Sequence, residues 1–478
     1  MKKVFTFCLM AVAVMGLQAK VYTFADLSNI ENSGVTYADG VFYVNVNADL
    51  TEPIELDNGG ITVSKTDLTL ADGNGLKIED GITVLFGEKA RITMNGKLDA
   101  DLENGATLSA TEEAAGNAIG IRLIGEESDA VLTNVTFQYI GIGFGGSLEK
   151  GSFVAKNCEF LDFNGKLANA NINFTAMSKG NLIKDCTFSN GLMACVASGA
   201  NTPVGITIEG CVMDKNGTQG RLTPAINMTV GMGGTEDVNI LNNEVIGREV
   251  TTRAGGISVA NLLGLAYSGT VNIKGNVVKY NSFGIACTGP FTSVIEDNIS
   301  IDNHYIADPN NGGSGINITA NTGGAVARIH NNYVEGNCWG VTLIGIKRTD
   351  DGDWMVPENA ISVDMGTEDE PGGNVFVDNG NKGVLYDLYN NSAFDVPARG
   401  NTWNVDDQND LEAIEEVIVH QVDNELYGLV DFAPLNSGIT DVKAATVTDG
   451  RYYNLMGQPV ANPTSGIYIH NGVKVVIR

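Results

Sequence analysis

Short stretches of alternating apolar and polar residues recur along this chain, each followed by an Asn or Cys and a second short stretch. The clearest copies are IKGNVVKYNSFGI (273–285) and IHNNYVEGNCWGV (329–341). Alternation with a period of two residues predicts β-strands, and the longer runs with a 3.6-residue period that predict helices are absent from this region. Repetition of one strand motif along a chain predicts a solenoid, in which each repeat stacks on the one before it.

The Asn or Cys of this motif is a reference position that can be followed from copy to copy. Neighbouring reference positions lie between 22 residues (Asn276 to Asn298) and 42 residues (Asn332 to Asn374) apart, while the strand motif stays constant. Constant strands with loops of variable length predict a parallel β-helix, whose coils stack about 4.8 Å apart. The reference positions are Val135, Cys158, Cys186, Cys211, Asn243, Asn276, Asn298, Asn332, Asn374 and Asn401.

A second series of asparagines lies five residues after the reference position. We interpret both series as structural ladders, because Asn tolerates left-handed backbone angles at corners and amides in register hydrogen-bond from coil to coil. Cys158, Cys186 and Cys211 share the reference phase, and we interpret them as an inward ladder of small apolar thiols rather than as disulfides. The second series comprises Asn216, Asn281, Asn303, Asn337 and Asn379.

The N-terminus predicts export. Lys2 and Lys3 precede an apolar run over 4–17, and a small residue follows, so we expect a signal peptide over 1–19 that is cleaved between Ala19 and Lys20. The run is too short to span a bilayer comfortably, and no later stretch is apolar enough to do so. The mature chain is therefore expected to have no membrane span.

The ends of a solenoid need covering, because exposed strand edges aggregate. We expect an N-terminal cap over 20–60, coils over 61–435, and a helix over 410–421 that covers the last coils. Asp410 is the predicted N-cap of this helix. Its predicted apolar stripe is Leu411, Ile414, Val417 and Ile418.

Two parts of the coil region are similar to a known family. The segments LKIEDGITVLFG, ARITMNGKLDA, AIGIRL and VLTNVTF, within 76–137, resemble the opening coils of the pectin-lyase-like superfamily. Residues 401–435 resemble the terminal coil and helix of that superfamily. The resemblance implies an all-β, right-handed parallel β-helix. It implies little about chemistry, because the fold hosts lyases, hydrolases, adhesins and inert modules.

The C-terminal segment resembles a different module, the sorting domain of proteins exported by type IX secretion. The resemblance lies in Tyr453-Asn454-Leu455-x-Gly457, in Gly466-Ile467-Tyr468 and in Lys474. Short strands broken by Gly and Pro predict a small β-sandwich over 445–478, after a linker over 436–444. The resemblance implies that this secretion machinery is a partner and that the protein is secreted or held at the cell surface. A periplasmic location is expected if the module is not a sorting signal.

The strong acidity of the chain changes which partners are expected. The net charge is −28 and the pI is about 4.4, which argues against nucleic acid and anionic membranes. An extracellular polysaccharide remains, with Ca²⁺ as the bridging cation if the polymer is acidic. The four histidines show no metal-ligand spacing, so no resident metal or cofactor is predicted. Binding of Ca²⁺ is left as an open alternative.

Two sets of residues are candidates for chemistry. Lyases of the resembled fold use a basic residue beside a uronate carboxyl. Arg221 and Arg253 each lie ten residues after a reference position, with Arg248 and Asp214 near in sequence. Ordinary surface ion pairing also accounts for them, and the cluster of aspartates that a lyase needs is not found.

Three aromatic residues in or near the long connections are candidates for stacking against sugar rings: Trp339, Trp354 and Tyr305. The alternative is that these aromatic side chains pack at corners of the coils.

Two functional hypotheses follow from these patterns. The first is a non-catalytic extracellular β-helix that binds a glycan or another surface partner. The second is a polysaccharide lyase or glycoside hydrolase. The first is favoured, because the acid and base clusters expected of an enzyme are missing from the sequence.

Overall fold

The structure is a computed structural model of the whole chain that divides into two compact units, Met1–Thr270 and Val271–Arg478. Each unit is described by itself. The residues described are 21–31, 33–44, 53–56, 59–63, 67–70, 72–164, 169–200, 202–217, 223–248, 254–308, 312–320, 323–345, 347–348, 354–355, 361–435, 450–454, 458–471 and 473–477.

The first unit begins with a short helix and a hairpin, within the segment predicted as a cap. Thr23 closes a capping box on the helix, since its hydroxyl accepts the Asp26 N–H at 3.1 Å and the Asp26 carboxylate accepts the Thr23 N–H at 2.9 Å. The hairpin strand β3 pairs in parallel with β8, which extends the sheet of the coils. These elements are β1 (Val21–Thr23), α1 (Phe24–Ser28), β2 (Val35–Ala38), β3 (Val41–Val44), β7 (Gly75–Lys77) and β8 (Thr83–Phe86).

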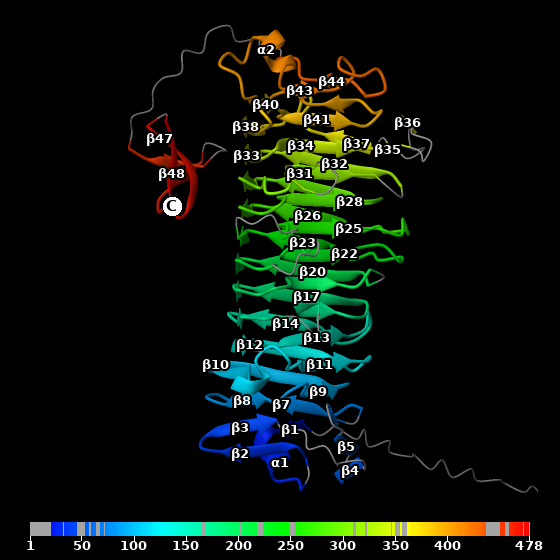
Figure 1. Cartoon of the computed structure of the whole chain (residues 1–478), viewed down its shortest axis with the longest axis vertical. Helices are drawn as coiled ribbons and strands as arrows, with labels where there is room; N and C mark the ends of the chain where they lie inside the picture. Colours follow the sequence, from blue (N-terminus) through cyan, green and yellow to red (C-terminus); the bar gives the residue numbers. More distant parts are fainter. Residues whose placement is uncertain are drawn as a thin grey trace, which may run out of the picture. The chain divides into compact units, whose positions relative to one another are not determined.

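The coils of the first unit each supply three short stretches of strand, which pair in parallel with the same stretches of the next coil (Figure 1). One ladder runs through β10 (Lys97–Ala110), β12 (Asp129–Gln138), β14 (Phe153–Lys156), β17 (Ser178–Lys184), β20 (Val204–Glu209) and β23 (Val238–Leu241). After a corner, the second contains β15 (Glu159–Leu161), β18 (Thr187–Ser189), β21 (Val212–Asp214) and β24 (Glu244–Ile246). The third contains β6 (Asp67–Leu70), β9 (Arg91–Met94), β11 (Gly120–Ile124), β13 (Gly141–Gly145), β16 (Ala170–Phe174), β19 (Ala194–Ser198), β22 (Ile226–Thr229) and β25 (Ile257–Ala260), and the hairpin of β4 (Pro53–Leu56) and β5 (Gly59–Val63) joins it.

The second unit repeats this three-stranded coil (Figure 1). Its first ladder contains β26 (Thr270–Lys274), β29 (Thr292–Glu296), β32 (Ala325–His330) and β37 (Ile361–Asp364). Its second contains β27 (Val277–Lys279), β30 (Ile299–Ile301), β33 (Tyr333–Glu335) and β38 (Val375–Val377). Its third contains β28 (Ile285–Thr288), β31 (Ser314–Thr319), β34 (Trp339–Ile344), β41 (Leu388–Asn391) and β43 (Ile418–Val419). The predicted fold class, an all-β right-handed parallel β-helix, is confirmed.

Three short pairings lie beside these ladders in the second unit. Two are antiparallel and one is parallel. They are β35 (Lys347–Arg348) with β36 (Trp354–Met355), β39 (Gly380–Asn381) with β40 (Val384–Leu385), and β42 (Val396–Pro397) with β44 (Val430–Asp431).

The core of the first unit contains identical side chains stacked from coil to coil. In the first unit Phe137, Phe160 and Phe188 stack face to face, with ring centroids 4.9 and 4.7 Å apart. All three rings are fully buried. Parallel strands in register bring the same position of every coil together, so one apolar residue per repeat builds a continuous core.

The asparagine series form hydrogen-bonded ladders in the second unit. The Oδ1 of Asn298 accepts the backbone N–H of Asn276 at 2.9 Å, and the Oδ1 of Asn332 accepts that of Asn298 at 3.0 Å. The second series repeats this geometry, since the Oδ1 of the buried Asn303 accepts the backbone N–H of Asn281 at 3.0 Å. The left-handed angles predicted for these residues are wrong. Positive φ occurs one residue earlier, as at Asp297 (φ 58°), so the ladder residue follows the corner.

The cysteines at the reference position donate as the asparagines do. The Sγ of Cys186 lies 3.3 Å from the carbonyl oxygen of Lys184 and 3.7 Å from that of Ala155 in the preceding coil. These carbonyls correspond to the acceptors that ladder asparagines use. The neighbouring thiols Cys158 and Cys211, together with burial, raise the pKa of Cys186, so it stays a protonated donor. The interpretation as purely apolar side chains is therefore incomplete.

The helix predicted over 410–421 is wrong in length. Helix α2 spans only Leu411–Glu415, although Asp410 is its N-cap as predicted and accepts the N–H groups of Glu412 and Ala413 at 3.1 Å. Leu411 is exposed, whereas Ile414 is buried. The chain then forms β43, because pairing with the open edge of β41 satisfies more backbone groups than another helical turn would.

The C-terminal segment is a small antiparallel sheet. Its four strands have the order β46–β45–β47–β48, and they are the one sheet that its described residues form. Their bounds are β45 (Tyr452–Tyr453), β46 (Pro459–Val460), β47 (Gly466–His470) and β48 (Val473–Ile477). The predicted signal peptide with Ala19 and Lys20, and the predicted linker over 436–444, lie outside the described residues.

Candidate functional site

A groove of about 490 Å³ lies over the third ladder of the first unit, across β16, β19 and β22. Its floor is set by strand register, which aligns Asn173 with Ala197 and Ala197 with Asn227. The small Ala197 between two half-exposed asparagines keeps the groove open. The strands thus hold two amides on one face, one coil to either side of an alanine.

The groove is lined by hydroxyls, amides and small apolar groups. The Ser198 hydroxyl accepts the Thr229 N–H at 2.8 Å, which leaves its own proton free to donate. None of the described lining residues is charged. They are Asn169, Asn173, Phe174, Thr175, Met193, Ala194, Ala197, Ser198, Gly199, Ala200, Thr202, Thr223 and Asn227. Neutral donors and acceptors beside small apolar surfaces match the hydroxyls and C–H faces of sugars.

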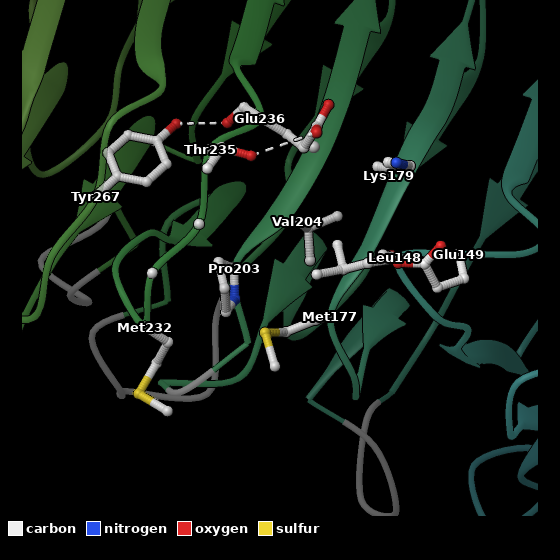
Figure 2. A pocket seen from close by; sticks show the side chains of 14 residues that line it. Leu148, Glu149, Met177, Lys179, Pro203, Val204, Met232, Thr235, Glu236 and Tyr267 are labelled. Carbon is white, nitrogen blue, oxygen red and sulfur yellow. Dashed lines mark hydrogen bonds between the residues drawn. The ribbon is translucent and has the colours of Figure 1, made fainter.

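A second hollow of about 300 Å³ lies at the neighbouring corner of the same unit (Figure 2). Leu148, Met177 and Met232 line it and are each 38–42% exposed. The Tyr267 hydroxyl donates to the backbone oxygen of Glu236 at 2.8 Å, as Figure 2 shows. Burial raises the pKa of Tyr267 well above its usual range, so the phenol stays a donor and its ring is held in place.

The two hollows share two turns of the chain. Thr175 lines the groove and Met177 lines the corner hollow, two residues further along. Thr202 and Pro203 are adjacent in sequence and line the groove and the hollow respectively. Adjacent residues are 3.8 Å apart, so a single extended ligand can occupy both hollows.

The structure describes two of the four charged residues predicted from the sequence. Burial lowers the pKa of Arg248, an effect that the Asp214 carboxylate opposes, so the two interact. The Nε of Arg248 is buried and has no hydrogen-bond partner. Arg221 and Arg253 lie outside the described residues. Both are in segments that lead into β22 and β25.

Trp339, one of the aromatic candidates, is packed inside its coil. Its indole is only 6% exposed, with its centroid 6.2 Å from that of Tyr386, so the packing alternative applies to Trp339 rather than sugar stacking. The reason is that β34 is covered on both faces. Tyr305 is half-buried beside His304. The Trp354 side chain lies outside the described residues.

One arginine of the second unit, Arg328, is already paired with carboxylates. The Arg328 guanidinium contacts Glu296 at 2.7 Å, Asp364 at 3.2 Å and Glu370 at 2.7 Å. Three carboxylates already bind this guanidinium, so it is not available to bind the carboxylate of a sugar. Within the described part of the chain, no three His, Cys, Asp or Glu side chains gather as metal ligands.

Sequence reasoning missed the groove residues. The signal was present in the outward positions of the third ladder, where Asn173 and Asn227 flank a small residue at the same phase. This alignment could not be recognised in the sequence without the strand register, because the loops before these strands differ in length. The Met-lined hollow comes from turns, whose positions carry no repeat pattern.

The fold and the two hollows define a parallel β-helix protein with an uncharged surface groove. No family model and no curated protein matches the chain. Among solved structures it is similar to the periplasmic alginate epimerase AlgG, with 10% identity over 87% of this chain and 83% of that one, at a TM-score of 0.42. It is also similar to a mannuronic acid-specific family 6 polysaccharide lyase from human gut microbiota, with 15% identity over 78% and 87%, at a TM-score of 0.41. A family 6 lyase from Pseudopedobacter saltans has 15% identity over 74% and 87%, at a TM-score of 0.35.

Helices in the described residues are short. None is long and apolar enough to cross a membrane.

Proposed function

We propose that this protein is an exported, non-catalytic β-helix protein that binds a polysaccharide in the groove over β16, β19 and β22. The observation that carries the proposal is the uncharged lining of that groove, in which Asn173 and Asn227 stand in register on either side of Ala197. Export rests on the predicted signal peptide. Delivery by the type IX machinery rests on the resemblance of the C-terminal segment to sorting domains.

The spacing of the coils supports a polymer rather than a single sugar. Parallel strands repeat the same outward position at about 4.8 Å per coil. Asn173 and Asn227 are two coils apart and present amides that both donate and accept. A polymer with a regular run of hydroxyls can meet both amides at once, and each added contact raises the affinity without a second loss of translational freedom.

One observation favours a catalytic alternative, a polysaccharide lyase or glycoside hydrolase. Arg248 has a lowered pKa and an unpartnered buried Nε, and Asp214 interacts with it. Perturbed basic groups of this kind concentrate at active sites. Incubation of the mature protein with a glycan panel distinguishes the two, because an enzyme releases unsaturated or reducing ends and loses that activity in Arg248→Ala.

The double variant Asn173→Ala/Asn227→Ala is expected to bind its polysaccharide about 5- to 150-fold more weakly, since each lost hydrogen bond contributes about 0.5–1.5 kcal/mol. Affinity is measured by titration calorimetry on the mature protein. The control is Asn317→Ala, which removes an outward asparagine from β31 in the second unit and should leave the affinity unchanged. Unchanged affinity in the double variant would place binding elsewhere on the molecule.

A further inference from the structure

The corner hollow is chemically unlike the groove beside it. Its apolar lining consists of Leu148, Met177 and Met232, together with Pro203 and Tyr267 (Figure 2). Its polar rim carries one ammonium, Lys179, and two carboxylates, Glu149 and Glu236. A sugar ring that carries only hydroxyls would lose hydration against the thioethers without gaining hydrogen bonds there.

We infer that the polysaccharide bound in the groove carries acyl esters, and that the corner hollow receives the acyl group. This inference rests on the proposed polysaccharide-binding function. The acyl methyl packs against Met177 and Met232, whose flexible and polarisable side chains adapt to small apolar groups. The ester carbonyl accepts a hydrogen bond from the exposed Lys179 at the rim.

The rim charges exclude other substituents. Glu149 and Glu236 together outweigh Lys179, so a carboxylate or sulfate group on the sugar would meet net repulsion. A second copy of this chain is disfavoured as the occupant, because each molecule carries a net charge of −28. A neutral substituent on a neutral polymer fits both the hollow and the groove.

The backbone of Gly205, which lines the hollow, is approached closely by side chains of the two neighbouring coils. A Cβ on Gly205 would lie 2.5 Å from the Cβ of Glu236 and 3.4 Å from that of Lys179. Because glycine has no Cβ, the side chains of Glu236 and Lys179, from the two neighbouring coils, fit on either side of Gly205. Thr202 of the groove and Pro203 of the hollow are adjacent in sequence, so a chain that places its backbone in the groove can place its ester in the hollow.

The test uses matched polymers that differ only in their esters. Native O-acetylated glucomannan and O-acetylated xylan are each compared with the same polymer after mild alkaline de-esterification, in titrations of the full mature protein. We expect the acetylated forms to bind about 4-fold more tightly, as burial of one methyl group in an apolar site predicts. Met177→Gln/Met232→Gln should lose this preference and keep its affinity for the de-esterified polymers within about twofold.

Leu262→Gln is the control, since it changes an equally exposed apolar side chain that does not line the hollow. It should retain the preference, and loss of the preference in this variant would overturn the inference. Equal binding of acetylated and de-esterified polymers by the unmodified protein would also overturn it and leave polysaccharide binding intact. Absence of binding to every polymer in both forms would overturn the proposed function as well.

Discussion

Replacement of Asn332 by alanine is expected to destabilise the second unit by about 4 kcal/mol. The buried Asn332 amide nitrogen lies 2.9 Å from the carbonyl oxygen of Ile295 and 3.0 Å from that of His330. Its Oδ1 accepts both the backbone N–H and the side-chain amide of Asn298 at 3.0 Å. The His330 oxygen keeps the Asp297 N–H, and the Asn298 amide keeps the Ile273 oxygen. Alanine removes the Asn332 partner of the Asn298 backbone N–H and of the Ile295 oxygen, at about 1–3 kcal/mol for each group left unsatisfied.

Urea unfolding followed by circular dichroism measures this loss, with Asn317→Ala as the control. Asn317 is an outward, half-buried asparagine of β31, and its replacement should change stability by no more than about 0.5 kcal/mol. The contrast separates the ladder from the mere loss of an amide. A loss in Asn332→Ala no larger than in Asn317→Ala would mean that stacking of the coils, rather than the ladder, supplies the stability.

The sequence predicted the ladders well because they follow from a fixed register. One residue per coil at one phase is visible in the sequence even when loop lengths change. The prediction for the corner angle was wrong by one position, because Asn is common both at left-handed corners and just after them. At Asp297 and Asn298 the two roles are adjacent, and the structure assigns the positive φ to the first.

The cysteines show where residue type alone misleads. Cys186 occupies the ladder phase in a buried position, which the sequence pattern indicates as apolar packing. The structure places its sulfur near the two carbonyls that a ladder amide would contact. A thiol is a weak donor, so it satisfies these carbonyls less well than an amide does.

The candidate site was less predictable than the fold. Arginines and tryptophans were chosen as candidate site residues because they carry recognisable chemistry, yet Trp339 is buried. The groove consists of common residues such as Asn173 and Ala197 that become a site only through strand register and loop placement. Such a surface has no motif, because its function comes from the spacing of coils rather than from reactive groups.

Asp387 is expected to make the stability of the second unit fall as the pH rises from about 4 to about 7. Its carboxyl is fully buried, and one oxygen accepts the Asn404 N–H at 2.7 Å. Burial raises its pKa from 3.8 to about 7, against the opposing hydrogen bonds from Asn404 and Asn379, and the nearby Asp378 raises it further. The folded state therefore holds a proton that the unfolded state has already released between these two pH values.

The sign of the effect follows from this proton. The stabilisation is fully present below pH 3.8 and is lost as the pH rises to about 7, with an upper magnitude of about 4 kcal/mol for a shift of this size. Asp387→Asn cannot ionise, so it should be more stable than the unmodified protein at pH 8 and show a flatter profile between pH 5 and pH 8.

Urea unfolding at several pH values in this window provides the measurement. Asp406→Asn removes an exposed carboxylate near the same end of the unit and should leave the profile unchanged. Parallel profiles for the unmodified protein and Asp387→Asn would show that Asp387 ionises freely in the fold. A steeper profile in the unmodified protein would instead mean that a neutral carboxylic acid is part of the folded C-terminal coils, and that its ionisation weakens them as the pH rises to about 7.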